Sequence, residues 1–288
     1  MHIVFSPKIM CDRRGSIFTV FASIWLLAGC AQVGSPDGGE RDEVPPVVVS
    51  ASPSFGSTGW AGNLLQLTFD EFVKVKDARN QVLVSPPLSQ APKVLVKGRS
   101  IVVDLGDDLG PDRTYVVQFG NAIRDLRESN VAAGLLHVFS TGSELDSGRV
   151  AVDVVDAWTA EPSAGVRVML FRDSLPTGLL NPALPDSLRP LPEYVGLVGD
   201  SGTVDIGFLP QGGFAMVALK DLNGNYRADA GEPVGWWMSP VSTADSTGFR
   251  PALRLDTPPV MPATYLSGMR VDSSGFWRAK LEGWTELN

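Results

Sequence analysis

Alternation of apolar and polar residues with a period of two is the feature that most limits what this chain can fold into. Leu65, Leu67 and Phe69 alternate with polar residues. The same period recurs in residues 101–105, 115–119, 150–154 and 166–170. Strands with one buried face show it, because successive side chains point to opposite sides of a sheet. No long stretch has a helical period, and 30 glycines and 22 prolines punctuate the short runs. We therefore predict an all-β chain.

The first thirty residues carry features of export and lipid attachment. Arg13 and Arg14 precede an apolar run, residues 17–27, that is too short to cross a bilayer as a permanent helix. The run ends in Leu27-Ala28-Gly29-Cys30, which resembles the lipobox of bacterial lipoproteins. That resemblance implies a cleaved lipoprotein signal peptide in residues 1–29 and a covalent lipid on Cys30. An ordinary signal peptide with an incidental cysteine is the alternative.

Residues 30–44 are predicted to form an acidic, flexible tether. Glycine, proline and acidic side chains dominate the segment and leave too little apolar surface to offset the cost of ordering it. Acidic residues just after a lipidated cysteine also resemble signals that send lipoproteins to the outside of the outer membrane. We therefore expect a protein that is anchored by lipid in the outer membrane and exposed at the cell surface.

Charge, cysteine and histidine counts exclude several function classes. The formal net charge is −8 and becomes −10 without residues 1–29, so a nucleic-acid partner is not expected. Once Cys11 is removed and Cys30 carries lipid, no thiol is left for disulfides, zinc or nucleophilic catalysis. His137 is then the one histidine, in a strand-like run that predicts a packing role. We therefore predict that the protein is not an enzyme.

Two pairs of neighbouring carboxylates are the candidates for a carboxylate-dependent hydrolase, which is the least favoured alternative. The pairs are Asp70-Glu71 and Asp107-Asp108. Adjacent strand residues point to opposite faces, so Asp70 and Glu71 do not converge easily on one bond. A solvated strand end and a turn are the simpler interpretation.

Residues 45–142 resemble a known β-sandwich family. The landmarks, in order, are Pro46, Ser52-Pro53, Leu65 to Glu71, Leu109 to Tyr115, Ile123-Arg124-Asp125 and Phe139 to Gly142. They resemble the bacterial Ig-like domain first noted in S-layer proteins. The resemblance implies two packed antiparallel sheets, as the spacing of the turn signals also indicates.

Residues 148–236 resemble a second small sandwich, the prealbumin-like fold of carboxypeptidase regulatory and collagen-adhesin B-type repeats. The resemblance is carried by Gly148-Arg149-Val150, Ala164 to Val168, Asp200-Ser201-Gly202 and Leu209 to Phe214. It implies an accessory module without an active site. Prolines in residues 172–194 predict an exposed excursion, which either binds a partner or has no role. Residues 237–288 are predicted to form a C-terminal β extension.

Residues 221–232 have the ligand spacing of a calcium loop. Oxygen-bearing side chains occupy its first, third, fifth, ninth and twelfth positions, and a backbone carbonyl is available at the seventh. In order, these residues are Asp221, Asn223, Asn225, Asp229 and Glu232, with Arg227 at the seventh position. Tyr226 replaces the usual glycine at the sixth position, and a strand precedes the loop. A structural Ca²⁺ is expected here, with a metal-free hairpin rich in Asx turns as the alternative.

The sequence as a whole predicts two tandem β-sandwiches that serve as a non-catalytic structural or adhesive display module at the envelope. The expected partners are the membrane, through the lipid, and a surface glycan or an envelope protein. An accessory carbohydrate-binding protein is the second hypothesis. It would use four tryptophans as a sugar platform, although core packing is their commoner use. These are Trp236, Trp237, Trp277 and Trp284.

Overall fold

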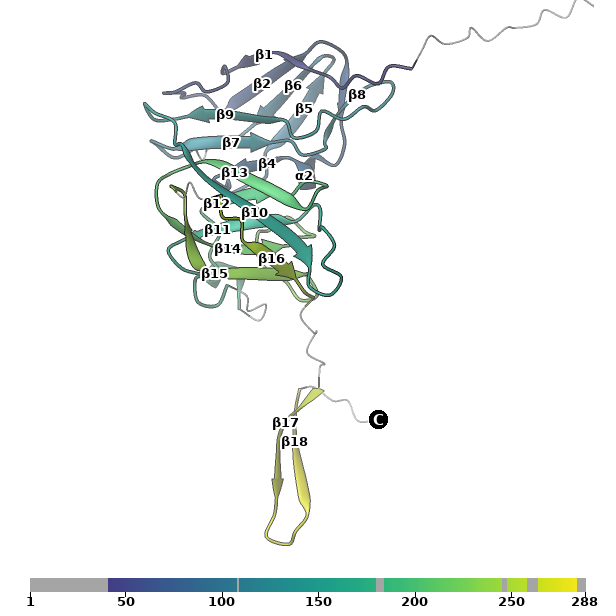
Figure 1. Cartoon of the computed structure of the whole chain (residues 1–288), viewed down its shortest axis with the longest axis vertical. Helices are drawn as coiled ribbons and strands as arrows, with labels where there is room; N and C mark the ends of the chain where they lie inside the picture. Colours follow the sequence, from purple (N-terminus) through teal and green to yellow (C-terminus); the bar gives the residue numbers. More distant parts are fainter. Residues whose placement is uncertain (1–40, 108, 180–183, 245–247, 258–263, 284–288) are drawn as a thin grey trace, which may run out of the picture. The chain divides into compact units, whose positions relative to one another are not determined.

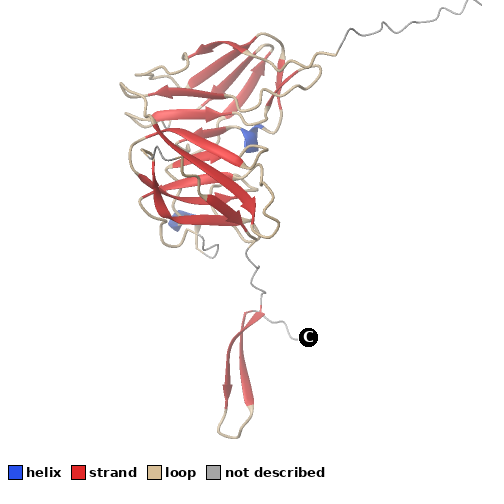
Figure 2. Ribbon diagram, viewed as in Figure 1, coloured by secondary structure: helices blue, strands red, loops and turns tan. Residues whose placement is uncertain are grey.

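The computed structural model describes residues 41–107, 109–179, 184–244, 248–257 and 264–283. Strands make up nearly all of their regular structure, which confirms the predicted all-β class (Figure 2). The exceptions are a four-residue helix, α2 (Ala78–Gln81), and a single 3₁₀ turn, η1 (Asp186–Leu188). Among the described residues, no helix has the length and apolar character needed to span a bilayer.

Two antiparallel sheets and a short ribbon form the first sandwich (Figure 1). The larger sheet has the order β1-β2-β6-β5, in which the strands are β1 (Val48–Ser52), β2 (Leu64–Phe69), β6 (Ser100–Asp104) and β5 (Lys93–Lys97). The smaller sheet has the order β4-β7-β9, with β4 (Leu83–Ser85), β7 (Thr114–Gln118) and β9 (Leu136–Ser140). The ribbon pairs β3 (Val73–Val75) with β8 (Ile123–Asp125).

The core of this sandwich follows from the period-two pattern. Leu65, Leu67 and Phe69 are at most 1% exposed and lie in one cluster with buried residues of β6 and β7. In the opposite sheet, Phe139 of β9 stacks on its cross-strand neighbour Tyr115 of β7, with ring centroids 5.6 Å apart, and both belong to the same core cluster. Burial of the apolar face of each strand is therefore what holds the two sheets together.

The second sandwich also has two sheets. One has the order β13-β10-β16, with β13 (Thr203–Leu209), β10 (Gly148–Asp156) and β16 (Ala252–Leu255). The other has the order β12-β11-β14-β15, with β12 (Tyr194–Leu197), β11 (Arg167–Arg172), β14 (Gly213–Leu219) and β15 (Val234–Ser242). All pairs are antiparallel except β10 with β16, which is parallel. The prealbumin-like resemblance of this sandwich stays a prediction.

The predicted boundary between residues 236 and 237 differs from the observed one. It falls inside β15, and β16 completes the sheet that contains β10. Leu253 and Leu255 are buried in the core of the second sandwich, because their alternation places both on its inner face. What remains of the predicted extension is a separate hairpin of β17 (Thr264–Val271) and β18 (Trp277–Gly283).

A further apolar cluster lies on the opposite face of the sheet that contains β11. Met169 and Phe171 of β11 belong to it, although Val168 and Leu170 of the same strand face the main core. Leu179, from the segment predicted as an exposed excursion, is only 2% exposed and packs into this cluster. The excursion therefore covers one side of a sheet that is buried on both faces, and the expectation of an exposed loop is wrong for this residue.

Candidate functional site

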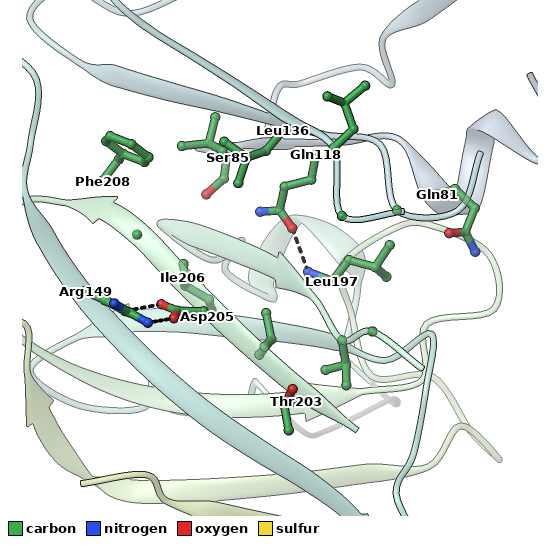
Figure 3. A pocket seen from close by; sticks show the side chains of 18 of the residues that line it. Gln81, Ser85, Gln118, Leu136, Arg149, Leu197, Thr203, Asp205, Ile206 and Phe208 are labelled. Carbon is green, nitrogen blue, oxygen red and sulfur yellow. Dashed lines mark hydrogen bonds and ion pairs between the residues drawn. The ribbon is translucent and has the colours of Figure 1, made fainter. Parts of the chain in front are cut away.

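Side chains of the first sandwich close the open edge of β12 in the second. The Gln118 amide donates from Nε2 to the carbonyl oxygen of Val195 over 3.3 Å. Its Oε1 accepts from the backbone nitrogen of Leu197 at 3.0 Å, as Figure 3 shows. The Ser85 hydroxyl accepts from the backbone nitrogen of Val195 at 3.0 Å. Because β12 is the last strand of its sheet, these bonds satisfy backbone groups that would otherwise need water or another strand.

Apolar packing and further hydrogen bonds extend this contact, the seam between the two sandwiches. Leu83 of β4 is 1% exposed and belongs to the apolar cluster of β11 and β14. Asn121 donates to both carboxylate oxygens of Asp200, at 3.3 and 3.0 Å. Gly120 fits closely at the seam: its φ is +49°, and a Cβ there would lie 2.8 Å from Leu197 Cδ2. The two sandwiches are therefore joined by specific, partly buried contacts.

A groove of about 880 Å³ opens between β7 and β9 of the first sandwich and β12 and β13 of the second. Figure 3 shows Leu136, Leu197, Ile206 and Phe208 among its lining side chains. Most of the lining is apolar, and Leu136 is 36% exposed. Its size suits the side chains of a bound segment or a small molecule.

Charged groups at this groove are mostly acidic. Asp146, Asp200 and Asp205 line it together with Arg149, whose guanidinium is paired with Asp205. The hydrogen bonds and the charge of Asp205 raise the pKa of Arg149. Because only one of the three carboxylates is matched by this arginine, the groove favours a ligand with positive charge.

His137 lies beside the groove as a buried side chain. It is 3% exposed, its ring hydrogen-bonds the backbone of Pro53, and its Nε2 has no hydrogen-bond partner among the described residues. Burial lowers the pKa of its imidazole. Phe55 packs edge-on against this ring at 5.8 Å and against Phe208 at 6.5 Å, measured between ring centroids. The predicted packing role agrees with this position.

Phe208 has a strained backbone at the end of the groove. Its φ is +58°, a left-handed conformation that bulky residues rarely adopt. The strain coincides with a break in the register between β10 and β13. Strained residues of this kind are concentrated at binding sites, where surrounding contacts hold them in place. Together with the apolar lining, this conformation makes the groove the strongest candidate site among the described residues.

The loop of residues 221–232 is held by two buried arginines that the sequence prediction did not include. Arg167 of β11 is paired with Asp221, and the two side chains are 3% and 0% exposed. Arg189, which follows η1, is paired with Asp229 at 2.9 Å. Burial opposes ionisation of Asp229, but hydrogen bonds from Asn223, Arg189 and Asn225 outweigh it and lower the pKa of this carboxyl group.

The backbone of this loop resembles a calcium loop more closely than its side chains do. Tyr226, at the sixth position, has a φ of +58°, in the region that a glycine would favour, and its nitrogen donates to Asp221 at 2.9 Å. Both oxygens of Glu232 accept backbone nitrogens, from Leu222 at 2.8 Å and from Asp229 at 3.0 Å.

The carboxylates of the loop are already hydrogen-bonded, and the described residues contain no cluster of three or more His, Cys, Asp or Glu side chains that could hold a metal ion. The side chain of Arg227 donates a hydrogen bond from Nε to the carbonyl oxygen of Asp186 at 3.2 Å. For Ca²⁺ to bind Asp221, Arg167 would have to move away. Calcium binding by this loop stays a prediction.

The carboxylate pairs considered for hydrolysis have local structural partners. Asp70 accepts a hydrogen bond from the backbone of Val47 at 2.9 Å, and Asp107 accepts one from Asn63 at 3.2 Å. Asp108 lies outside the described residues. These contacts fit the interpretation of a strand end and a turn.

The tryptophans expected to form a sugar platform do not share one surface. Trp236 and Trp237 are neighbours on β15, so they point to opposite faces: Trp236 is 51% exposed, while Trp237 packs against the core. Trp277 is on the hairpin, and Trp284 lies outside the described residues. The signal peptide, Cys30 and most of the tether, residues 1–40, also lie outside them.

Comparison with protein-family models matches residues 42–141 to the bacterial Ig-like domain. Comparison with curated proteins gives no match. Three solved structures share low sequence identity with this chain. The N-terminal part of the bacterial S-layer protein SbsC is 14% identical with a TM-score of 0.25, over 70% of this chain and 43% of that N-terminal part. The BcpA major pilin subunit of Bacillus cereus is 9% identical with a TM-score of 0.23, over 70% of this chain and 66% of the pilin. An L,D-transpeptidase from Mycobacterium smegmatis is 12% identical with a TM-score of 0.25, over 75% and 91% of the two chains.

The chain thus spans less than two thirds of the first two structures, and TM-scores this low carry no argument about function. The family match is independent of them and agrees with the sandwich of β1 to β9. Residues 42–141 form a bacterial Ig-like domain, as their landmarks predict.

Proposed function

We propose that this protein is a lipid-anchored surface protein whose two coupled β-sandwiches form a rigid, non-catalytic display or adhesion module. The observation that supports the proposal most is the seam, in which Gln118 and Ser85 satisfy the edge of β12. Domains joined by a flexible linker alone move independently, whereas a hydrogen-bonded seam with apolar packing restrains them. A restrained pair of domains holds the surfaces of its two sandwiches in a fixed arrangement relative to each other.

The proposed anchor is a lipid on Cys30, followed by the acidic tether. About 14 residues at ~3.3 Å each give a maximum reach of roughly 46 Å, which clears the headgroup layer. More than one acyl chain is needed for stable attachment, since each buried CH₂ contributes only about 0.8 kcal/mol. The bacterial Ig-like domain is consistent with a structural or adhesive role.

Metabolic labelling with palmitate tests the anchor directly. We expect label on the wild-type protein and none on Cys30→Ala, with Cys11→Ala as the matched control that keeps its label. Protease added to intact cells should digest the wild-type protein, because the proposal places it on the outer surface. Label that persists in Cys30→Ala, or protection from protease until the cells are lysed, contradicts the proposal.

A further inference from the structure

The loop of residues 221–232 contacts both sandwiches. Arg79, an exposed residue of α2 in the first sandwich, donates from its guanidinium to the carbonyl oxygen of Asn223 at 2.8 Å. Gly224, the next residue, has a φ of +78°, and a Cβ there would lie 3.8 Å from Nε of Arg79 and 3.6 Å from Nη1 of Arg167. An arginine from each sandwich therefore lies beside the same turn of the loop.

One peptide group connects these two arginines. The nitrogen of Gly224 donates to the carboxylate of Asp221 at 2.7 Å, and the carbonyl oxygen that accepts from Arg79 belongs to the same peptide group. In a trans peptide the N–H and C=O bonds point in opposite directions, so this group lies between a carboxylate and a guanidinium. Both partners polarise the peptide group in the same sense, which strengthens both hydrogen bonds.

This chain of contacts begins in the interior of the second sandwich and ends on α2 of the first. Arg167 and Asp221 form its buried end. Asp221 also accepts from the backbone nitrogen of Tyr226 at 2.9 Å, so its carboxylate determines the conformation of the loop backbone. Because Arg79 bonds to a backbone oxygen, the position of its acceptor depends on that conformation and not on the side chain of Asn223.

The loop also contributes to the apolar part of the seam. Ala228 of the loop is 6% exposed and belongs to the apolar cluster that contains Leu83 of β4. Residue 82 alone separates α2 from β4, so Arg79 and Leu83 hold the same short segment of the first sandwich. Ser85, at the end of this segment, accepts from the edge of β12. Order in the loop and closure of the seam therefore involve the same segment.

We propose that the loop of residues 221–232 is a strap that holds the first sandwich to the second, with Arg79 as its positioning residue. The buried pair of Arg167 and Asp221 then controls how often the seam opens. Release of Asp221 frees the peptide group that follows Asn223, and the seam loosens by a local opening that unfolds neither sandwich. This inference rests on the proposed role of the seam as a restraint, but it does not depend on the lipid anchor.

Hydrogen exchange at the edge of β12 measures how often the seam opens. The nitrogens of Val195 and Leu197 donate to Ser85 and Gln118 across the seam, so their amide hydrogens exchange when it opens. Arg79→Ala in the full-length chain should increase these exchange rates about two- to tenfold, as for the loss of one hydrogen bond. Amides of β2 and β14, in the two cores, should keep their rates. Mass spectrometry of overlapping peptides provides the measurement.

Two further variants calibrate this experiment. Arg250 donates to Asp153 at 3.0 Å within the second sandwich, so Arg250→Ala removes an exposed arginine contact that does not cross the seam. This matched control should leave exchange in β12 unchanged. Gln118→Ala is the positive control, and it should accelerate exchange at Val195, which keeps its own acceptor, Ser85.

The double variant Arg167→Met/Asp221→Leu tests whether the buried pair controls the seam. It removes both charges and so leaves no uncompensated charge in the interior. Exchange in β12 should increase at least as much as in Arg79→Ala. Adding Arg79→Ala to the double variant should then cause little further increase, because the bond of Arg79 requires the ordered loop.

Three outcomes overturn the proposal. If Arg79→Ala leaves exchange in β12 at the wild-type rate while Gln118→Ala accelerates it, the seam restrains the sandwiches but the loop is not a strap. If the effects of Arg79→Ala and of the double variant multiply, the two contacts act independently. If Gln118→Ala also leaves Val195 unchanged, the seam is not a restraint, and the proposed rigid module fails together with the strap.

Discussion

Replacing Asp221 by alanine tests whether the buried ion pair holds the loop of residues 221–232 to the second sandwich. The carboxylate of Asp221 is 0% exposed and is paired with Arg167, which is 3% exposed. It also accepts hydrogen bonds from the backbone nitrogens of Gly224 at 2.7 Å and Tyr226 at 2.9 Å. The ring of Tyr226 lies against the guanidinium of Arg167, with 5.1 Å between the carbon Cζ and the ring centroid. One substitution therefore removes the partner of a buried cation and the acceptor of the backbone nitrogens of Gly224 and Tyr226. A third nitrogen, that of Asn225, lies 3.3 Å from Asp221 and keeps Asn223 as an acceptor at 3.0 Å.

The expected loss of stability is large. Removing one partner of a buried ion pair costs about 3–5 kcal/mol, because the remaining charge stays buried without compensation. The two backbone donors add about 1 kcal/mol each if water does not reach them, so we expect a loss of about 5 kcal/mol. Total stabilities are about 5–15 kcal/mol, and each kcal/mol corresponds to about 2–4 °C for a cooperative unit of about 150–250 residues, the combined size of the two coupled sandwiches. The melting temperature of this unit should fall by about 10–20 °C.

Calorimetry of the full chain, supported by urea unfolding, measures this change. The double variant Arg167→Met/Asp221→Leu removes both charges and should recover much of the loss, since apolar residues of similar volume often replace a buried ion pair without cost. The ion pair of Arg149 and Asp205 is the matched control. Its side chains are 68% and 40% exposed, so Asp205→Ala should change the melting temperature little.

Two results would refute the reasoning about the buried pair. If Asp221→Ala melts close to Asp205→Ala, Arg167 has another way to reach solvent or a partner. If the double variant is as unstable as the single one, the loss comes from the loop backbone and not from an uncompensated charge.

Three further predictions concern calcium, pH and the seam. If residues 221–232 bind calcium, as their spacing predicts, 1 mM Ca²⁺ raises the melting temperature of the wild-type protein but not of Asp229→Asn; an unchanged wild-type value contradicts this prediction. Because burial lowers the pKa of His137 in the folded state, the unfolded chain takes up a proton first as the pH falls, so the free energy of unfolding should decrease between about pH 7 and pH 5. His137→Phe should remove that part of the pH dependence in urea unfolding, and an unchanged dependence would assign it to other groups. Gln118→Ala should lower stability by about 1–3 kcal/mol and increase the radius of gyration in solution scattering, because β12 loses two hydrogen bonds at the seam; equal scattering of the two proteins would show that the seam does not restrain the sandwiches.

Residues that alternate within one strand were predictable from the sequence. Leu65, Leu67 and Phe69 are buried because alternation is a local property: each residue predicts the orientation of the next. The turn signals predicted where strands end because they too depend only on residues that are close together in the sequence. The bacterial Ig-like domain could be recognised since its landmarks occur in a fixed order within about one hundred residues.

The functional surfaces could not be predicted in this way, because they join residues that are distant in the sequence. Gln118 bonds to residues 77 and 79 positions further along the chain, and nothing near it indicates that partner. For Arg167 a signal was present that the sequence prediction did not use: Met169 and Phe171 share its face of β11, and a strand with two apolar faces indicates a buried arginine that needs a carboxylate. The boundary at residue 236 was misplaced since β16 reaches its sheet only after a long connection.

Closure of β12 also determines where a partner can be recognised. An open strand edge binds other chains through its backbone, with little dependence on side chains. Since Gln118 and Ser85 occupy the backbone groups of β12 at the seam, addition of a strand to that edge is blocked. Recognition at the adjoining groove must then proceed through side chains, including Leu136, Phe208 and the acidic residues that line it. The contacts that restrain the two sandwiches therefore also make the groove selective, which is why changes at Gln118 should alter both stability and any association at the groove.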